Sequence, residues 1–248
     1  MIWAMLSSEL AKVRGRRGTF WTAIGLPLLV SIVTLVVLLV LKDAKPESYE
    51  SGKNALDIFA TSGLFVLLGV SLVGAQEGAY DVQQGTFRYL LMTGRSKSEL
   101  YLLRVAVMLI VALLVALPSV ALGLAASLLL PHAVDHKALE LSDAALFAWT
   151  MLLIGFVYGL VAMSVGALLR SSGAAIAVSL GLNFIGLQLL ALVEQVDDSL
   201  GKLMLPNAMA TLSGDKAGDS IAIAALVVLV WLGAIVALGG FRTTRAEY

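Results

Sequence analysis

Six apolar stretches that contain no Asp, Glu, Lys, Arg or His constrain this chain more than any other feature of its sequence. A helix needs roughly 20 residues to cross a hydrocarbon core about 30 Å thick, and each stretch is about that long or longer. Only helices and closed barrels cross a bilayer, because lipid offers the backbone no hydrogen-bond partner. We therefore predict an all-α integral membrane protein with six transmembrane helices in one domain, 1–248. The stretches are 18–41, 58–76, 105–131, 144–169, 171–193 and 220–241.

The composition places the whole chain in the same class. Of the 248 residues, 59% are apolar and 14% are charged, whereas soluble domains average about 45–50% and about 25%. The chain has no cysteine, which excludes disulfides, thiolate metal sites and cysteine catalysis. His132 and His136 would share a face if their segment were helical, but a solvated segment is the simpler interpretation, and we predict no metal site.

The basic residues are distributed unequally between the two predicted sides of the membrane. An even number of spans places both termini on one side, which carries eleven Lys or Arg residues against six on the other. Because Lys and Arg concentrate in cytoplasmic loops, we predict cytoplasmic termini and a multi-pass protein of the cell membrane. The eleven are Lys12, Arg14, Arg16, Arg17, Arg88, Arg95, Lys97, Arg104, Arg170, Arg242 and Arg245, and the six are Lys42, Lys45, Lys53, Lys137, Lys202 and Lys216.

Residues 1–17 are predicted to form a helix that lies in the membrane interface. Their apolar side chains fall within one arc of a helical wheel, with most of the basic ones outside it. Glu9 falls inside the apolar arc, where it can pair with Lys12 three residues on. A cleaved signal peptide is the alternative, but the following apolar run is too long and no small-residue cleavage site comes after it. The apolar residues of the arc are Ile2, Trp3, Met5, Leu6, Leu10 and Val13.

A long polar segment, 77–99, joins the second and third spans on the predicted cytoplasmic side. Glu77 and Asp81 come just after the end of an apolar run. They can form ion pairs with Arg88 or Arg104, or they can be hydrated, and the sequence leaves these alternatives open.

The rest of this segment predicts a helix, a break and a second helix. Gly85 and Thr86 can open the first helix, Gly94 can close it, and its apolar face consists of Phe87, Leu90 and Leu91. The sequence Ser96-Lys97-Ser98-Glu99 then has the spacing of a capping box, so the next helix is predicted to start there.

The order and spacing of these residues resemble the first cytoplasmic loop of the permease subunits of type-2 ABC exporters. The family pattern is an acidic residue, Gly-Thr, an apolar residue, Arg, a Leu pair, and a small-residue break with a basic residue. The corresponding residues are Glu77, Gly85-Thr86-Phe87-Arg88-Tyr89-Leu90-Leu91 and Gly94-Arg95-Ser96. The resemblance implies that 86–92 is a coupling helix that docks on a separate ATPase subunit, with coupling residues Gly85, Thr86, Phe87, Arg88, Leu90, Leu91 and Arg95. The alternative is that Arg88, Arg95, Lys97 and Arg104 are ordinary interfacial anchors.

The segment 195–219 contains Leu203-Met204-Leu205-Pro206-Asn207, which is too apolar for a free loop and too broken to span, so we predict that this segment re-enters the outer leaflet. The resemblance extends along the chain, because such permeases begin with an interfacial elbow helix and carry short outer helices before the last span, here within 195–219. It implies export of a hydrophobic, lipid-like, drug or peptide substrate by two permease subunits, identical or homologous, and two ATPase subunits that bind ATP and Mg. The chain contains no G-x-x-x-x-G-K-[ST] motif. We therefore expect no catalytic residue, cofactor or nucleic-acid partner for this subunit itself.

Two other functions compete with this one. A passive channel or homo-oligomeric pore would need no coupling loop. A membrane-embedded enzyme would need catalytic groups inside the spans, such as paired aspartates or His with Glu, and the six stretches contain none of these residues.

Polar and small residues within the spans predict a pathway and packing contacts. Asn183 and Glu194 lie eleven residues apart, close to three helical turns, so they share a face that we assign to the substrate pathway. Pro27 and Pro118 can kink the first and third spans. Two sets of small residues predict close helix packing: Gly155, Gly159, Ala162 and Gly166 on the fourth span, and Gly173, Ala177 and Gly181 on the fifth.

Overall fold

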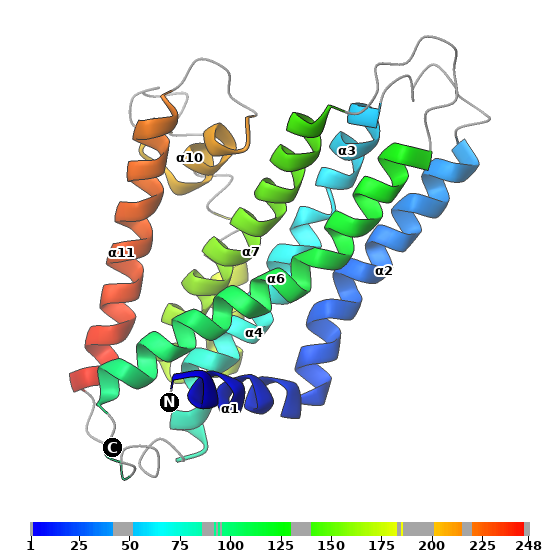
Figure 1. Ribbon diagram of the computed structural model, residues 1–248. Coiled ribbons are helices and arrows are strands. Elements are labelled where there is room, and N and C mark those ends of the chain that lie inside the picture. Colours follow the sequence, from blue (N-terminus) through cyan, green and yellow to red (C-terminus); the bar gives the residue numbers. More distant parts are fainter. Residues whose placement is uncertain are drawn as a thin grey trace.

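The computed structural model describes residues 2–41, 52–85, 92, 94, 96–129, 140–182, 185, 201–214 and 220–245, and every regular element in these ranges is a helix, as predicted (Figure 1). The labelled helices are α1 (Ile2–Gly15), α2 (Arg17–Leu41), α3 (Gly52–Ala60), α4 (Gly63–Gln83), α6 (Lys97–Leu129), α7 (Leu141–Leu169), α10 (Leu205–Leu212) and α11 (Ile221–Arg245). A further apolar helix covers Ser172–Leu182.

Five of these helical segments are long and apolar enough to cross a membrane: Arg17–Val40, Ala55–Gln83, Lys97–Leu129, Leu141–Leu169 and Ile221–Arg245. They correspond to five of the six predicted spans. The remaining span, 171–193, is described mainly over Ser172–Leu182, which is too short to cross a bilayer alone. The sixth span therefore stays a prediction.

The helices pack around α4, which contacts α2, α6 and α7. Most of α4 is buried, whereas α2 and α11 expose most of their length. Figure 1 shows α1 lying across the end of the bundle at which α4 and α11 end and α6 begins. We call this the proximal end, and we call the opposite end, where α10 packs against α11, the distal end.

Glycines bring α4 and α7 into backbone contact. A Cβ added to Gly74 would overlap the carbonyl oxygen of Gly159, and one added to Gly166 would lie 2.5 Å from the carbonyl oxygen of Ala75. Small residues allow this approach where lipid supplies no hydrophobic drive. The predicted packing role is thus confirmed for the small residues of α7.

The second set of small residues behaves differently. Gly173 and Gly181 have no described neighbour within 4 Å of an added Cβ, and Ala177 is exposed. These residues share one helix, Ser172–Leu182, whose small face is therefore open in the described structure. The predicted packing of this set is not seen within the chain.

Pro27 of α2 frees a backbone carbonyl that α4 covers. Proline has no N–H to donate four residues back, so the carbonyl oxygen of Ala23 lacks its helical donor, and Gly69 of α4 lies directly against it. A glycine Cα–H is a weak donor to such an oxygen. One turn beyond Pro27, Ser31 donates a 2.9 Å hydrogen bond to Ser119, the neighbour of Pro118 in α6. The two proline-containing helices are thereby joined at one level.

Short helical structure lies within the predicted outer segment 195–219. The side-chain amide of Asn207 on α10 donates to the carbonyl of Gly201 at 2.8 Å, and the indole of Trp231 on α11 donates to the carbonyl of Leu203 at 3.0 Å. The first bond joins α10 to the residues before it, and the second joins those residues to α11. Re-entry of this segment into the bilayer stays a prediction.

Candidate functional site

Charged side chains are buried together at the proximal end, where α4 ends. Glu77 is 2% exposed, Asp81 6% and Arg104 3%. The sequence places both acids beyond the end of a span, but α4 continues to Gln83 and contains them. Isolated charges in such a position are unfavourable, because burial removes their hydration. Each carboxylate must therefore have a partner within the protein.

Asp81 is paired with Arg104. Nη2 of Arg104 donates to Oδ2 of Asp81 at 2.5 Å, and both side chains are almost fully buried. Of the alternatives that the sequence leaves open for Asp81, the structure selects this ion pair. It joins the last turns of α4 to the second turn of α6, so the two helices that flank 86–95 are held to each other at its base.

Glu77 is paired with Arg16, which lies in the break between α1 and α2. The guanidinium of Arg16 also stacks over the ring of Tyr80, 3.9 Å from its centroid. Sequence reasoning treats Arg16 only as an interfacial anchor, and its partner is 61 residues away. Because the sequence places Glu77 beyond the end of a span, it gives no signal that identifies Arg16 as the partner of this carboxylate.

Glu9 completes the cluster from α1. It bonds Lys12 at 2.5 Å, as predicted, and it is only 4% exposed. Glu9 also interacts electrostatically with Glu77. Leu6, Leu10 and Val13 of the apolar arc pack on the bundle core, and Glu9, which falls within the same arc, is buried as well. We define the charged cluster as Glu9, Lys12, Arg16, Glu77, Asp81 and Arg104, which contains three acids and three bases.

The start of α6, next to the cluster, follows the predicted capping chemistry. Ser96 Oγ accepts from the backbone N–H of Glu99, and Oε2 of Glu99 accepts from the N–H of Ser96, both at 3.1 Å. This capping box confirms the predicted start of α6. Gly85 has a φ of +67° and follows α4. A glycine with positive φ commonly ends a helix, so Gly85 closes α4, whereas the sequence predicts that it opens the next helix.

Further contacts tie the proximal helix ends together. Ser172 donates to the side-chain oxygen of Gln83 at 2.9 Å, and Lys97 donates to the carbonyl of Thr244 at 3.2 Å. Tyr101 of α6 bonds Ser164 of α7 at 3.0 Å, and Gly239 of α11 packs against the same pair. The start of α6 is therefore anchored to both α7 and α11.

Most predicted coupling and pathway residues lie outside the described residues. These are Thr86, Phe87, Arg88, Leu90, Leu91 and Arg95 of the coupling segment, and Asn183 and Glu194 of the pathway. Their roles stay predictions. His132 and His136 also lie outside the described residues. Met92, at the end of the coupling segment, is helical and 73% exposed.

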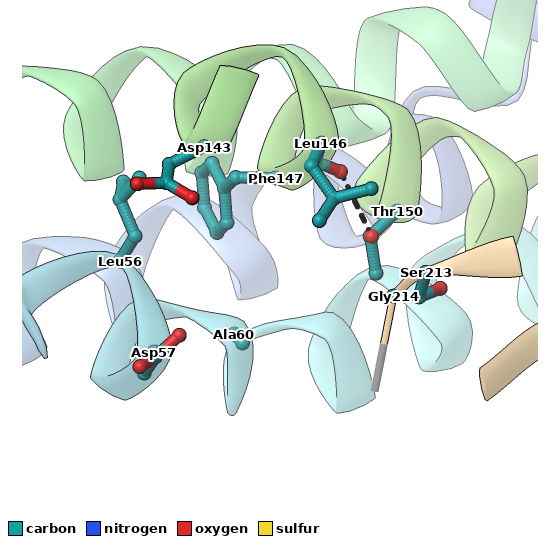
Figure 2. A pocket seen from close by; sticks show the side chains of 9 residues that line it. All are labelled: Leu56, Asp57, Ala60, Asp143, Leu146, Phe147, Thr150, Ser213 and Gly214. Carbon is teal, nitrogen blue, oxygen red and sulfur yellow. Dashed lines mark hydrogen bonds between the residues drawn. The ribbon is translucent and has the colours of Figure 1, made fainter. Parts of the chain in front are cut away.

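A hollow lies at the distal end between α3, α7 and the turn after α10 (Figure 2). Its volume is about 130 Å³, and Asp57 of α3 and Asp143 of α7 contribute to its lining. The hydroxyl of Thr150 donates to the carbonyl of Leu146 at 2.9 Å. Sequence reasoning assigned no function to these residues. Asp57 is exposed, which makes this hollow a solvated recess.

The helices and the charged cluster define a helical multi-pass membrane protein whose buried charges brace one end of the bundle. The sequence matches no known protein-family model, and no curated protein matches it significantly.

Proposed function

We propose that this chain is the permease subunit of a type-2 ABC exporter, located in the cell membrane with six spans and both termini in the cytoplasm. It works with a second permease subunit and two ATPase subunits. ATP binding closes the ATPase pair, the closure displaces the coupling segments 86–92, and the two permease subunits alternate between inward and outward access. The exported substrate is hydrophobic, lipid-like, a drug or a peptide.

The brace between Asp81 and Arg104 is the structural observation that supports this proposal most. A coupling segment transmits force only if the helices that carry it do not yield separately. The ion pair joins α4 to α6 at the base of 86–95, and Arg16 joins the end of α4 to the α1–α2 corner. A push on 86–92 would therefore displace α1, α4 and α6 together.

Packing at the bundle centre favours a pathway between two subunits. Val66 and Val70 of α4 are fully buried, and α4 meets α7 in backbone contact at Gly74. In the part of the chain that the structure describes, the centre is thus filled by side chains. A passage for substrate must then form at the edge of the subunit, where Ser172–Leu182 exposes its small face and where we place Asn183 and Glu194.

Recovery of the ATPase with the permease tests this proposal. The tagged permease would be purified from its native cells, and the amount of co-purified ATPase and its rate of ATP hydrolysis would be measured. We expect the double variant Phe87→Ala and Leu91→Ala to weaken recovery of the ATPase. Truncating a residue buried in such a contact can cost about 2 kcal/mol of binding free energy or more.

Leu141→Ala is the control, because Leu141 is a large apolar residue that is exposed at the distal end of the bundle, away from the coupling segment. It should leave recovery and transport unchanged. A Phe87/Leu91 double variant that binds its ATPase and transports normally would contradict the coupling role of 86–92, and an unaltered permease that recovers no ATPase would support the passive pore.

A further inference from the structure

An apolar groove lies on the outside of the bundle between α6 and α7. Its volume is about 370 Å³, and every residue that lines it is apolar. At its base Ala112 of α6 faces Gly155 of α7, where a Cβ added to the glycine would lie 3.3 Å from that of Ala112. Leu113 and Trp149 line its walls and are about half exposed, at 46% and 49%. The groove therefore exists because small residues form its base and large ones its walls.

The position of the groove within the membrane follows from the length of α7. Its 29 residues correspond to about 43 Å at about 1.5 Å per residue, against a hydrocarbon core of about 30 Å. An upright, centred helix would extend roughly 7 Å beyond each boundary. Trp149 lies eight residues from Leu141, the distal end of α7, or about 12 Å. Its backbone is then about 5 Å inside the distal boundary, and Phe156, two turns further along α7, lies near the membrane centre.

The indole of Trp149 has no acceptor among the described residues, unlike that of Trp231, which donates to the carbonyl of Leu203. Tryptophan concentrates at the membrane interface because its ring is apolar while its N–H seeks a polar partner. The indole N–H of Trp149 requires a hydrogen-bond acceptor, and the apolar lining requires a hydrocarbon. A suitable occupant therefore has an acceptor oxygen at the Trp149 end of the groove and a hydrocarbon chain that extends from it toward the membrane centre. A transmembrane helix supplies this poorly, because its backbone carbonyls are used within the helix.

We propose that the α6–α7 groove binds one acyl chain of a phospholipid in the distal leaflet, and that Trp149 donates to the ester carbonyl at the head of that chain. The acyl chain lies along Leu113 and Leu109 of α6 and reaches toward Phe156. This lipid site does not depend on the transport function proposed above.

Tryptophan fluorescence in vesicles tests the site directly. The full chain would be reconstituted in ether-linked phosphatidylcholine, which lacks ester carbonyls, with increasing amounts of brominated ester-linked phosphatidylcholine as quencher. Two single-tryptophan variants are compared, one retaining Trp149 and one retaining Trp21, which is 61% exposed on α2 and does not line the groove. We expect half-maximal quenching of Trp149 at a mole fraction of brominated lipid about two- to tenfold lower than for Trp21. This factor is the preference for the ester-linked lipid that one hydrogen bond confers.

A groove-filling substitution provides the control. Leu113→Phe in the Trp149 variant should move half-maximal quenching to the mole fraction seen for Trp21, whereas Leu117→Phe, one turn along α6 and outside the groove, should not. Equal quenching curves for Trp149 and Trp21 would overturn the proposal. So would a preference that Leu113→Phe leaves in place. Weak quenching of Trp149 at every mole fraction would also overturn it, because a protein subunit would then cover the groove.

Discussion

Asp81 and Arg104 face each other at 2.5 Å across the base of the 86–95 segment, and both are almost completely buried. Asp81 belongs to α4 and Arg104 to α6, so this ion pair fixes the two helices that flank the proposed coupling segment to each other. Its burial makes it sensitive to the loss of either partner, since the remaining charge has no water to solvate it.

Removal of one partner should destabilise the protein strongly. We expect Asp81→Ala or Arg104→Ala to lower the free energy of unfolding by about 3–5 kcal/mol, measured in detergent by thermal unfolding. Replacing both by leucine should recover much of this loss, because no unpaired charge remains buried. Strictly additive losses in the double variant would show that the two charges do not depend on each other.

Arg16 should require its guanidinium and not merely its charge. It pairs with Glu77 and stacks on Tyr80, and lysine keeps the charge but loses the planar stacking surface. We expect Arg16→Lys to lower thermal stability by an intermediate amount and Arg16→Gln by more, with a stacking contribution of about 0.5–2 kcal/mol. Arg14→Gln is the control, because Arg14 is an exposed arginine near the end of α1, two residues before Arg16. Equal losses at positions 14 and 16 would contradict a specific role for Arg16.

Gly74 and Gly173 should respond oppositely to alanine. At Gly74 the new methyl group meets the backbone carbonyl of Gly159, so α4 and α7 must separate, and overpacking of this kind costs about 1–3 kcal/mol. At Gly173 an added Cβ has no described neighbour within 4 Å, and alanine is the better helix former. We therefore expect the melting temperature to fall for Gly74→Ala and to stay the same or rise for Gly173→Ala. A destabilised Gly173→Ala together with an unaffected Gly74→Ala would refute the packing described for α4 and α7.

Cysteine labelling in intact cells tests the proposed orientation. The natural chain has no cysteine, and Ser98 and Ser142 are exposed serines at opposite ends of the bundle. An impermeant maleimide should label Ser142→Cys in sealed cells and Ser98→Cys only after permeabilisation. Because both positions are exposed, the difference reports the side of the membrane. The reverse pattern would place the termini outside.

Several features of this protein were determined by the sequence alone, because their physical causes are local. A long uncharged apolar run becomes a membrane helix regardless of its neighbours, since the bilayer imposes that condition on each span separately. The capping box at Ser96 and Glu99 and the pair between Glu9 and Lys12 are equally local, because each joins residues three positions apart.

Only the tertiary structure decided which distant residues meet. The partner of Glu77 is 61 residues away and that of Asp81 is 23 residues away, and Glu77 has no nearby cation that would mark Arg16 in advance. The glycines of α7 and those of Ser172–Leu182 have similar spacing, yet among the described residues only the former contact another helix. Such differences depend on which helices pack side by side, and apolar side chains in lipid make many arrangements close in energy. The choice among them rests on backbone contacts and buried charges between separate helices, which no local pattern in the sequence encodes.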